Sequence, residues 1–252
     1  MPDVPCDPRA ATGPSLQERD SGSSKLADGA IRIVANDNRT PAGTLRHGVL
    51  TLRLDVCRGR WFPEADTGPS ELVLAFAEAG HRPQIPGPLI RVPAGTLIRA
   101  FVRNPLRDST LVLHGFHTRP GLAVDTIQVG PGSTSEVRFA AGGPGTFFYM
   151  GSTAAEPLDE QKGGDSQLYG ALVVDPPGAS PIAPDRVFAI GVWAAPRDTL
   201  GPKPWVPRDM MVINGRSWPY TERLTFTVGD TVRWRWINAT ADAHTMHLHG
   251  FY

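Results

Sequence analysis

Apolar and polar residues alternate along much of this chain, which is the pattern of strands that bury one face. The clearest case is the segment 49–56, VLTLRLDV, in which every second residue is apolar. Further short strands are expected at Leu97–Arg103, Thr110–Leu113, Ser135–Phe139, Thr146–Tyr149 and Gly170–Val174. Turn-forming strings such as PGP at 86–88 and GGPG at 142–145 separate them, and no long amphipathic helix is evident. The pattern predicts an all-β protein built as a sandwich or barrel.

The same pattern divides the chain into segments. Residues 1–43 are polar and without periodicity, which predicts a disordered or weakly ordered tail and order from about Gly48. A first domain is expected over 44–176, and the string DPPGASP at 175–181 indicates a linker over 177–184. A second domain would occupy 185–252. Within it LTFTV and VRWRW flank Gly229-Asp230, which predicts a β-hairpin.

Two stretches of the chain resemble each other. GTLIRAFVRNPLRDSTLVLHGFH begins at Gly95, and GDTVRWRWINATADAHTMHLHGFY begins at Gly229. In each stretch an asparagine lies nine residues after the glycine, and the string LHGF follows. We infer two copies of one β-domain, with His114 equivalent to His249. The second copy has only the 68 residues 185–252, whereas a sandwich of this kind needs about 100, so we expect it to be incomplete.

Composition narrows the function classes. Lys plus Arg and Asp plus Glu are 25 each, so the net charge of zero does not favour a nucleic-acid or anionic-membrane partner. No apolar run is long enough to span a membrane, and no signal peptide is visible at the start. Neither Cys6 nor Cys57 lies in a metal-ligand spacing, and we predict no structural disulfide because Cys6 lies in the tail.

Three of the seven histidines fall in the string HTMHLH at 244–249. In a strand, His247 and His249 would point to the same face about 7 Å apart, and His244 would point elsewhere. Imidazoles so placed suit copper, zinc, iron or nickel, in one site or in two adjacent sites. The alternative is three ordinary histidines at the end of a strand. His114 and His117, in the string HGFH, are weaker metal-ligand candidates.

At this point the chain resembles a known family. HTMHLHG, preceded by RWRWINA, is similar to the third copper motif of the multicopper oxidases, laccase-like enzymes built from plastocyanin-like domains. Supporting strings are GPLIRV at 87–92, LHGFH at 113–117, GTFFYM at 145–150 and DSQLYGALVVDP at 165–176. The resemblance covers about 44–252. It implies two cupredoxin-like Greek-key β-sandwich domains, the second incomplete, and copper as the cofactor.

The resemblance also implies roles for the histidines. In the family a type 1 copper takes electrons from a substrate and passes them to a three-copper cluster, which reduces dioxygen to water. By the motif, His244 would bind the type 1 copper and His247 the type 2 copper. His249 and His114 would bind type 3 copper, and His117 remains a further candidate ligand.

The chain departs from the family pattern at three ligand positions. Val112 stands where the first motif has a histidine, and Met150 and Ser152 stand where a later motif has two more. The fourth motif lies beyond the point where this sequence ends. We therefore expect a copper-binding oxidoreductase that oxidises a substrate by electron transfer to copper, but these departures oppose dioxygen reduction. The alternatives are a non-catalytic protein with one copper, for electron transfer or binding, and a structural sandwich without metal.

The partners and the location follow from the resemblance alone. It implies a small-molecule or metal-ion electron donor, dioxygen as acceptor, and a periplasmic or secreted protein. By analogy with two-domain members, it implies a homotrimer with copper sites between subunits. Trp234 and Trp236 alternate with arginines, which favours the core face of a strand over an electron path or a substrate platform.

Overall fold

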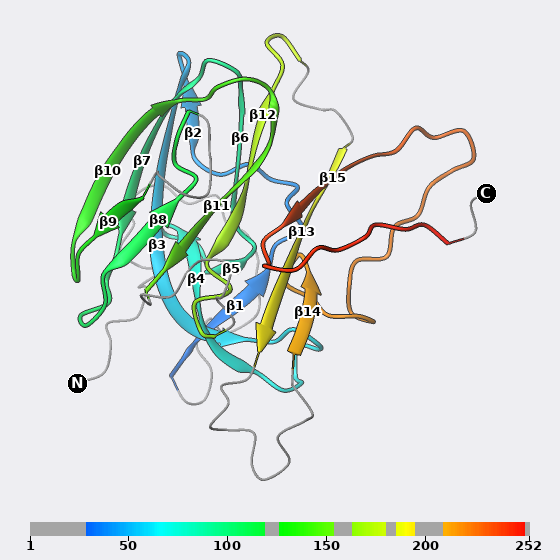
Figure 1. The fold of residues 1–252 in the computed structure, drawn as a ribbon, viewed down its shortest axis with the longest axis horizontal. Coiled ribbons are helices and arrows are strands. Elements are labelled where there is room, and N and C mark those ends of the chain that lie inside the picture. The colour runs from blue at the N-terminus through cyan, green and yellow to red at the C-terminus, as the bar shows by residue number, and fades with distance from the viewer. Residues whose placement is uncertain (1–28, 119–125, 154–162, 180–184, 195–208, 250–252) are drawn as a thin grey trace.

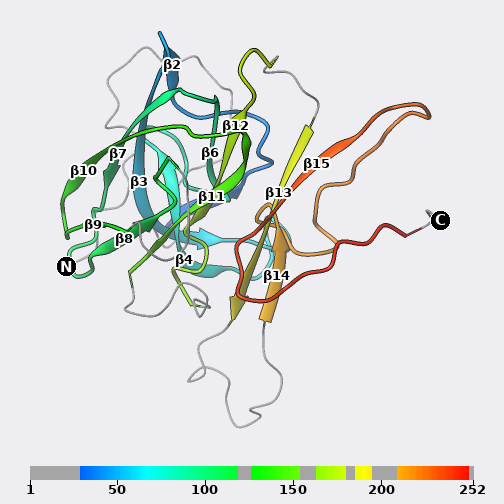
Figure 2. The same cartoon turned by 45° about the horizontal axis from the view of Figure 1, so that its top comes forward.

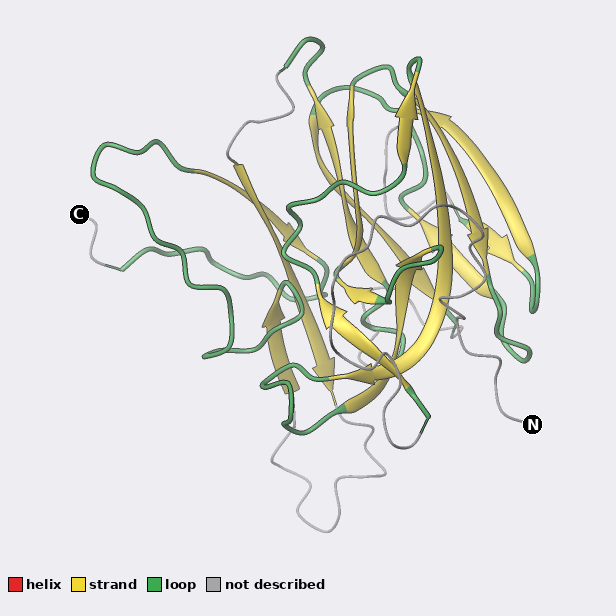
Figure 3. Cartoon of the chain, turned by 180° about the vertical axis from the view of Figure 1, so that it is seen from behind, coloured by secondary structure: helices red, strands yellow, loops and turns green. Residues whose placement is uncertain are grey.

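The computed structural model describes residues 29–118, 126–153, 163–179, 185–194 and 209–249, and these contain strands but no helix (Figures 1 and 3). The strands form three sheets, of seven, five and three strands. This confirms the all-β class that the alternating pattern predicts.

The first sheet has the order β1-β5-β4-β3-β7-β10, with β2 paired to β3. Its strands are β1 (Ile31–Ala35), β2 (Thr44–Arg46), β3 (Val49–Trp61), β4 (Glu71–Glu78), β5 (Gln84–Ile85), β7 (Leu97–Arg103) and β10 (Thr134–Ala140). The second sheet has the order β6-β12-β11-β8-β9. Its strands are β6 (Gly87–Pro93), β8 (Leu111–His114), β9 (Ile127–Val129), β11 (Gly145–Ser152) and β12 (Tyr169–Asp175).

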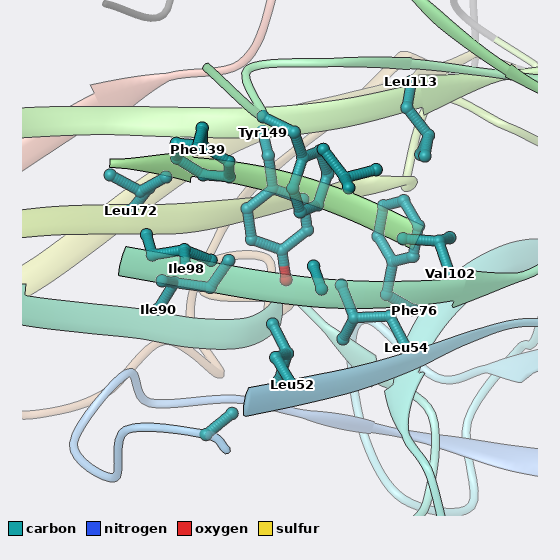
Figure 4. Close-up of a cluster of buried hydrophobic side chains, with 14 of the residues drawn as sticks. Leu52, Leu54, Phe76, Ile90, Ile98, Val102, Leu113, Phe139, Tyr149 and Leu172 are labelled. Atoms are coloured by element: carbon teal, nitrogen blue, oxygen red, sulfur yellow. The ribbon is translucent and has the colours of Figure 1, made fainter. Parts of the chain in front are cut away.

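These two sheets pack face to face as a β-sandwich around one apolar core (Figure 4). Leu52 and Leu54 of β3 lie on one side of this core, and Leu172 of β12 lies on the other. Both leucines of β3 are fully buried, so the face predicted from alternation over 49–56 is confirmed. Tyr149 of β11 is also fully buried, and its hydroxyl donates a 2.7 Å hydrogen bond to the carbonyl of Pro88.

Order begins earlier than the sequence pattern suggests. Residues Ile31–Ala35 lie within the predicted tail, yet they form β1, which pairs in parallel with β3 and β5. Ile31 and Ile33 are buried. The expectation of a disordered tail is therefore wrong for this strand, because its hydrogen-bond partners are distant in the sequence and leave no local periodicity. Residues 1–28 lie outside the described part of the chain.

The third sheet has the order β14-β13-β15, from β13 (Asp185–Ala194), β14 (Asp209–Ile213) and β15 (Arg233–Asn238). The predicted hairpin forms only in part. Thr227–Asp230 is a turn, in which the amide of Asp230 donates to the carbonyl of Thr227, but 224–228 is not a strand. Its Val228 is fully exposed. β15 pairs instead with β13, in parallel.

A second apolar cluster joins the third sheet to the sandwich. Val187 and Ala189 of β13 and Ile237 of β15 pack with Ala171 and Val173 of β12. Figure 2 shows β13 and β15 beside β11 and β12. Because side chains alternate along a strand, the residue between Val187 and Ala189 faces the opposite side of β13. β13 is therefore buried on both faces.

Polar contacts cross the same junction. The guanidinium of Arg91, on β6, binds Asp175 at the end of β12 and Asp185 at the start of β13. Asp185 also binds Arg235 of β15. Burial works to raise the pKa of Asp185, but the hydrogen bonds from the two arginines outweigh it and hold that pKa below its ordinary value. Nearby, the Nδ2 of Asn38 donates to the Oδ1 of Asn214.

Cys57 lies buried on β3 and is disulfide-bonded. The prediction of no structural disulfide is therefore wrong. The chain has one other cysteine, Cys6, which lies outside the described residues. The sequence pattern could not place that part of the chain relative to β3, and disulfide formation depends on that distance.

Candidate metal centre

The histidines of 244–249 follow β15 on a segment without regular secondary structure. A hydrogen-bonded turn sets its start: Asn238 Oδ1 accepts from the amide of Thr240, and Asn238 Nδ2 donates to the carbonyl of Asp242. The Oγ1 of Thr240 lies 2.8 Å from Nε2 of His244. This contact occupies one ring nitrogen of His244 and leaves the other for a further partner.

The structure brings His247 and His249 together. Their ring centroids are 4.9 Å apart and their planes are 82° apart. Both side chains are exposed, so an ion from solvent can reach them. A strand was expected over this segment, and the structure has none there. The two imidazoles are nevertheless close to each other, as their spacing predicts. Two neighbouring nitrogen donors are a partial ligand set for copper or zinc.

An aromatic cavity of about 760 Å³ lies beside this segment. Trp234 and Trp236 of β15 and Phe188 of β13 line it, and His247 lies at its wall. Phe188 packs on Trp236 with centroids 4.7 Å apart and on Trp234 with centroids 6.1 Å apart. The two tryptophans share one face of β15, as their alternation with arginines predicts. They are half-buried and line the cavity, outside the apolar clusters of the described residues, so the expectation that they form part of the core is wrong.

His114 occupies a different environment, at the end of β8. The residue is 9% exposed, and its Nδ1 has no hydrogen-bond partner within the described ranges. Burial lowers the pKa of His114, which keeps the imidazole neutral and its free nitrogen able to bind a metal. His117, three residues further along, is exposed.

The neighbours of His114 are not histidines. Met150 of β11 lies directly opposite His114 across the strand pair, and Ser152 lies opposite Val112. Asp165, which sequence analysis did not single out, accepts hydrogen bonds from the Ser152 hydroxyl at 3.4 Å and from the amide of Thr153 at 2.9 Å. Asp165 begins the string DSQLYG, so its only signal in the sequence was that resemblance.

The histidines form two separate groups. Figures 1 and 2 show β8 and the segment 244–249 apart, with β13 between them. Within the described residues, no group of three or more His, Cys, Asp or Glu side chains is placed to hold a metal ion. The ligand set of a three-copper cluster is therefore not assembled by this part of the chain. His247 with His249, and His114 alone, remain as nitrogen donors.

The two repeats predicted from sequence share a structural device. Asn104 Oδ1 accepts from the amide of Leu106, two residues on, and its Nδ2 donates to the carbonyl of Ser109. Asn238 makes the equivalent pair of contacts in the second copy. The asparagines thus close the same turn between a strand and a histidine-bearing segment.

Comparisons with known proteins agree with these motifs. Two family models described as multicopper oxidase match residues 79–179 and 195–252, which together are more than half of the chain. A probable nitrite reductase-hydroxylamine oxidoreductase fusion protein from Kuenenia stuttgartiensis is 31% identical over 188 residues, or 68% of this chain and 21% of that protein. An L-ascorbate oxidase from Cucurbita pepo var. melopepo is 35% identical over 106 residues, or 39% and 18%. The chain spans about a fifth of the length of these curated relatives.

Solved structures agree on the fold. The multicopper oxidase mgLAC superposes with a TM-score of 0.60 at 23% identity, over 79% of this chain and 64% of that one. A copper nitrite reductase from Nitrosomonas europaea superposes with a TM-score of 0.57 at 21% identity, over 76% and 68%. At such identity the likeness concerns the cupredoxin-type β-sandwich and not the chemistry.

Proposed function

Because the chain belongs to the multicopper oxidase family, whose cofactor is copper, we propose that it is a copper-binding oxidoreductase that oxidises a substrate by electron transfer to copper. The observation that carries this proposal is the pair of adjacent imidazoles at His247 and His249. Copper supplies one-electron redox chemistry when bound. His244 is the third candidate ligand, and the Thr240 hydroxyl orients its ring.

His114 and His117 complete the proposed set of metal ligands. His114 offers a buried and neutral nitrogen, whereas His117 is exposed. We propose no reduction of dioxygen by the described residues acting alone, because Val112, Met150 and Ser152 stand at positions where the family has imidazoles. A thioether or a hydroxyl is a poor replacement for a nitrogen donor at Cu(II).

Two structural units fit this function. We propose a first cupredoxin-like domain over 44–176, a linker over 177–184 and part of a second such domain over 185–252. The separate sheets and the equivalent turns at Asn104 and Asn238 support this division. β1 adds a strand to the first unit from within the predicted tail.

A copper titration of the full chain tests the proposal. We expect wild-type protein to bind copper, and the double variant His247→Ala/His249→Ala to lose the ion held there. His81→Ala is the matched control, since His81 is an exposed histidine elsewhere on the surface. Oxidation of a phenol or a metal ion by the loaded protein then tests electron transfer. Equal copper contents in all three proteins would exclude the pair as a ligand set.

A second candidate function is a non-catalytic protein that holds a single copper for electron transfer or binding. The observation that favours it is the separation of β8 from the segment 244–249 (Figure 1), together with the absence of a group of three or more His, Cys, Asp or Glu ligands among the described residues. Reversible reduction and reoxidation of bound copper, without turnover of any donor, would support this candidate over the oxidase.

The partners and the location remain proposals. We propose an electron donor and dioxygen as partners, a homotrimer, and a periplasmic or secreted site. The disulfide at Cys57 supports an oxidising compartment. Among the described residues, no helix is long and apolar enough to cross a membrane. Light scattering of the purified protein tests the trimer, and fractionation of cells tests the location.

A further inference from the structure

A row of three buried side chains crosses the outer face of the five-stranded sheet. Met150 of β11 pairs with His114 of β8 on one side and with Tyr169 of β12 on the other. Residues directly opposite each other in an antiparallel pair lie on the same face, with Cβ atoms about 5 Å apart. Tyr149, the neighbour of Met150, lies in the sandwich core, so the row faces away from that core.

Two members of this row carry polar atoms that the fold leaves unsatisfied. The Nδ1 of His114 and the hydroxyl of Tyr169 are buried and have no hydrogen-bond partner among the residues described. Buried polar atoms almost always find a partner in a native protein or an ordered water. The unpaired imidazole nitrogen of His114 and the thioether of Met150 beside it are thus two potential ligands for a metal ion.

Tyr169 does not complete this donor set. A Cβ atom built on Gly191 of β13 would lie 2.3 Å from the Tyr169 hydroxyl, so the tyrosine ring is turned onto β13. Met150 and His114 remain next to each other at the other side of the row. The following pair on the same face offers no competing ligand, because Val112 is apolar and the Ser152 hydroxyl contacts Asp165.

We propose that His114 and Met150 form a binding site for a single Cu(I) ion, through the imidazole Nδ1 and the thioether sulfur. A thioether is a soft donor and favours Cu(I) over Cu(II), and an imidazole nitrogen suits copper. Few donors in a buried site also suit a d¹⁰ ion, which has no ligand-field demand for four ligands in a plane. This inference rests on the proposed function only in that the protein encounters copper. The ion and its two ligands differ from those of a three-copper cluster.

Competition for Cu(I) tests the site directly. The full chain is titrated anaerobically with Cu(I) supplied as its bicinchoninate complex. We expect Met150→Leu, which keeps the side-chain volume, to weaken Cu(I) binding about 100-fold, at least as much as the loss of an outer-shell partner. His114→Gln should have a similar effect. Met246→Leu is the matched control, because Met246 lies beside the other histidines, and it should bind Cu(I) as the wild type does.

A spectroscopic measurement reads the donor without a substitution. Protein made with selenomethionine and loaded with Cu(I) should show copper–selenium scattering in X-ray absorption. The signal should persist in Met246→Leu and vanish in Met150→Leu. Absence of selenium around the copper, or a signal that survives Met150→Leu, would overturn the inference and leave a buried water as the partner of Nδ1.

The two proposals fail separately. If His247→Ala/His249→Ala leaves the copper content unchanged while Met150→Leu abolishes the selenium signal, the proposed function loses its carrying observation and the Cu(I) site stands. If the double variant loses copper while Met150→Leu binds Cu(I) with wild-type affinity, the Cu(I) site is refuted and the proposed function stands.

Discussion

Arg91 offers the sharpest test of how the third sheet is held to the sandwich. Its Nε and Nη2 lie 2.7 and 3.0 Å from the carboxylate of Asp175, and its Nη1 lies 2.7 Å from that of Asp185. The three side chains are 10%, 11% and 2% exposed. One arginine therefore neutralises two buried carboxylates that belong to different sheets.

We expect Arg91→Met to destabilise the protein by about 3 kcal/mol. Removal of one partner from a buried pair costs about 3–5 kcal/mol, because the remaining charge is left desolvated. The lower end applies here, since Arg235 still contacts both Asp185 and Asp175. Methionine keeps the apolar contacts of the arginine stem.

Urea unfolding followed by tryptophan fluorescence gives the free energy of unfolding. The double variant Arg91→Met/Asp185→Asn should lose less than the sum of the two single variants, because the second change removes a charge that the first left unpaired. Arg99→Met is the control. Its partner Glu136 is 30% exposed and Arg99 itself 42%, so its loss should cost below about 1 kcal/mol. Additive losses, or equal effects of Arg91→Met and Arg99→Met, would refute the reasoning.

Three further outcomes are expected. Gly191→Ala should cost about 1–3 kcal/mol in unfolding free energy by overpacking, because its Cβ would meet the hydroxyl of Tyr169, and Tyr169→Phe should restore part of that loss. Asn104→Ala should cost about 2–3 kcal/mol, because the buried carbonyl of Val129 and the buried amide of Leu106 lose their hydrogen bonds to this side chain. The pKa of Asp185 is below its ordinary value of 3.8. The stability that its ionised carboxylate contributes is therefore complete above pH 3.8 and is lost as the pH falls through the lower pKa of the folded protein. Acid unfolding of Arg91→Met should accordingly depend less on pH in this range than that of the wild type.

The features that the sequence predicted correctly are those set by residues close together along the chain. The alternation over 49–56 identified the core face of β3, because each buried side chain there has its periodic partner two residues away. The strand β1 escaped prediction since it is short and its backbone partners, on β3, on β5 and at Pro83, are all distant in the sequence. The arm 224–228 shows the reverse error. Its alternation is clear, but no described strand pairs with it, and the segment is exposed.

The contacts in the candidate site also divide into one that follows from local spacing and one that depends on the pairing of distant strands. Spacing alone predicted that His247 and His249 would be close, because only Leu248 lies between them in the chain. The closeness of His114 and Met150 depends on the register of β8 against β11, and that register is a long-range property. No residue pattern within either strand signals that Nδ1 of His114 would be left without a partner.

The double burial of β13 has a consequence for how the protein can change over time. A strand on a surface has a face where nearly any polar residue is tolerated, so half of its positions can vary freely. β13 has no such face, because seven of its ten residues are buried and only Asp185, Val192 and Ala194 are partly open. A replacement at a buried position of β13 has to fit against either the sandwich or the aromatic cavity. Substitutions that repack one side also shift the other, so the two units are constrained to evolve together through this one strand.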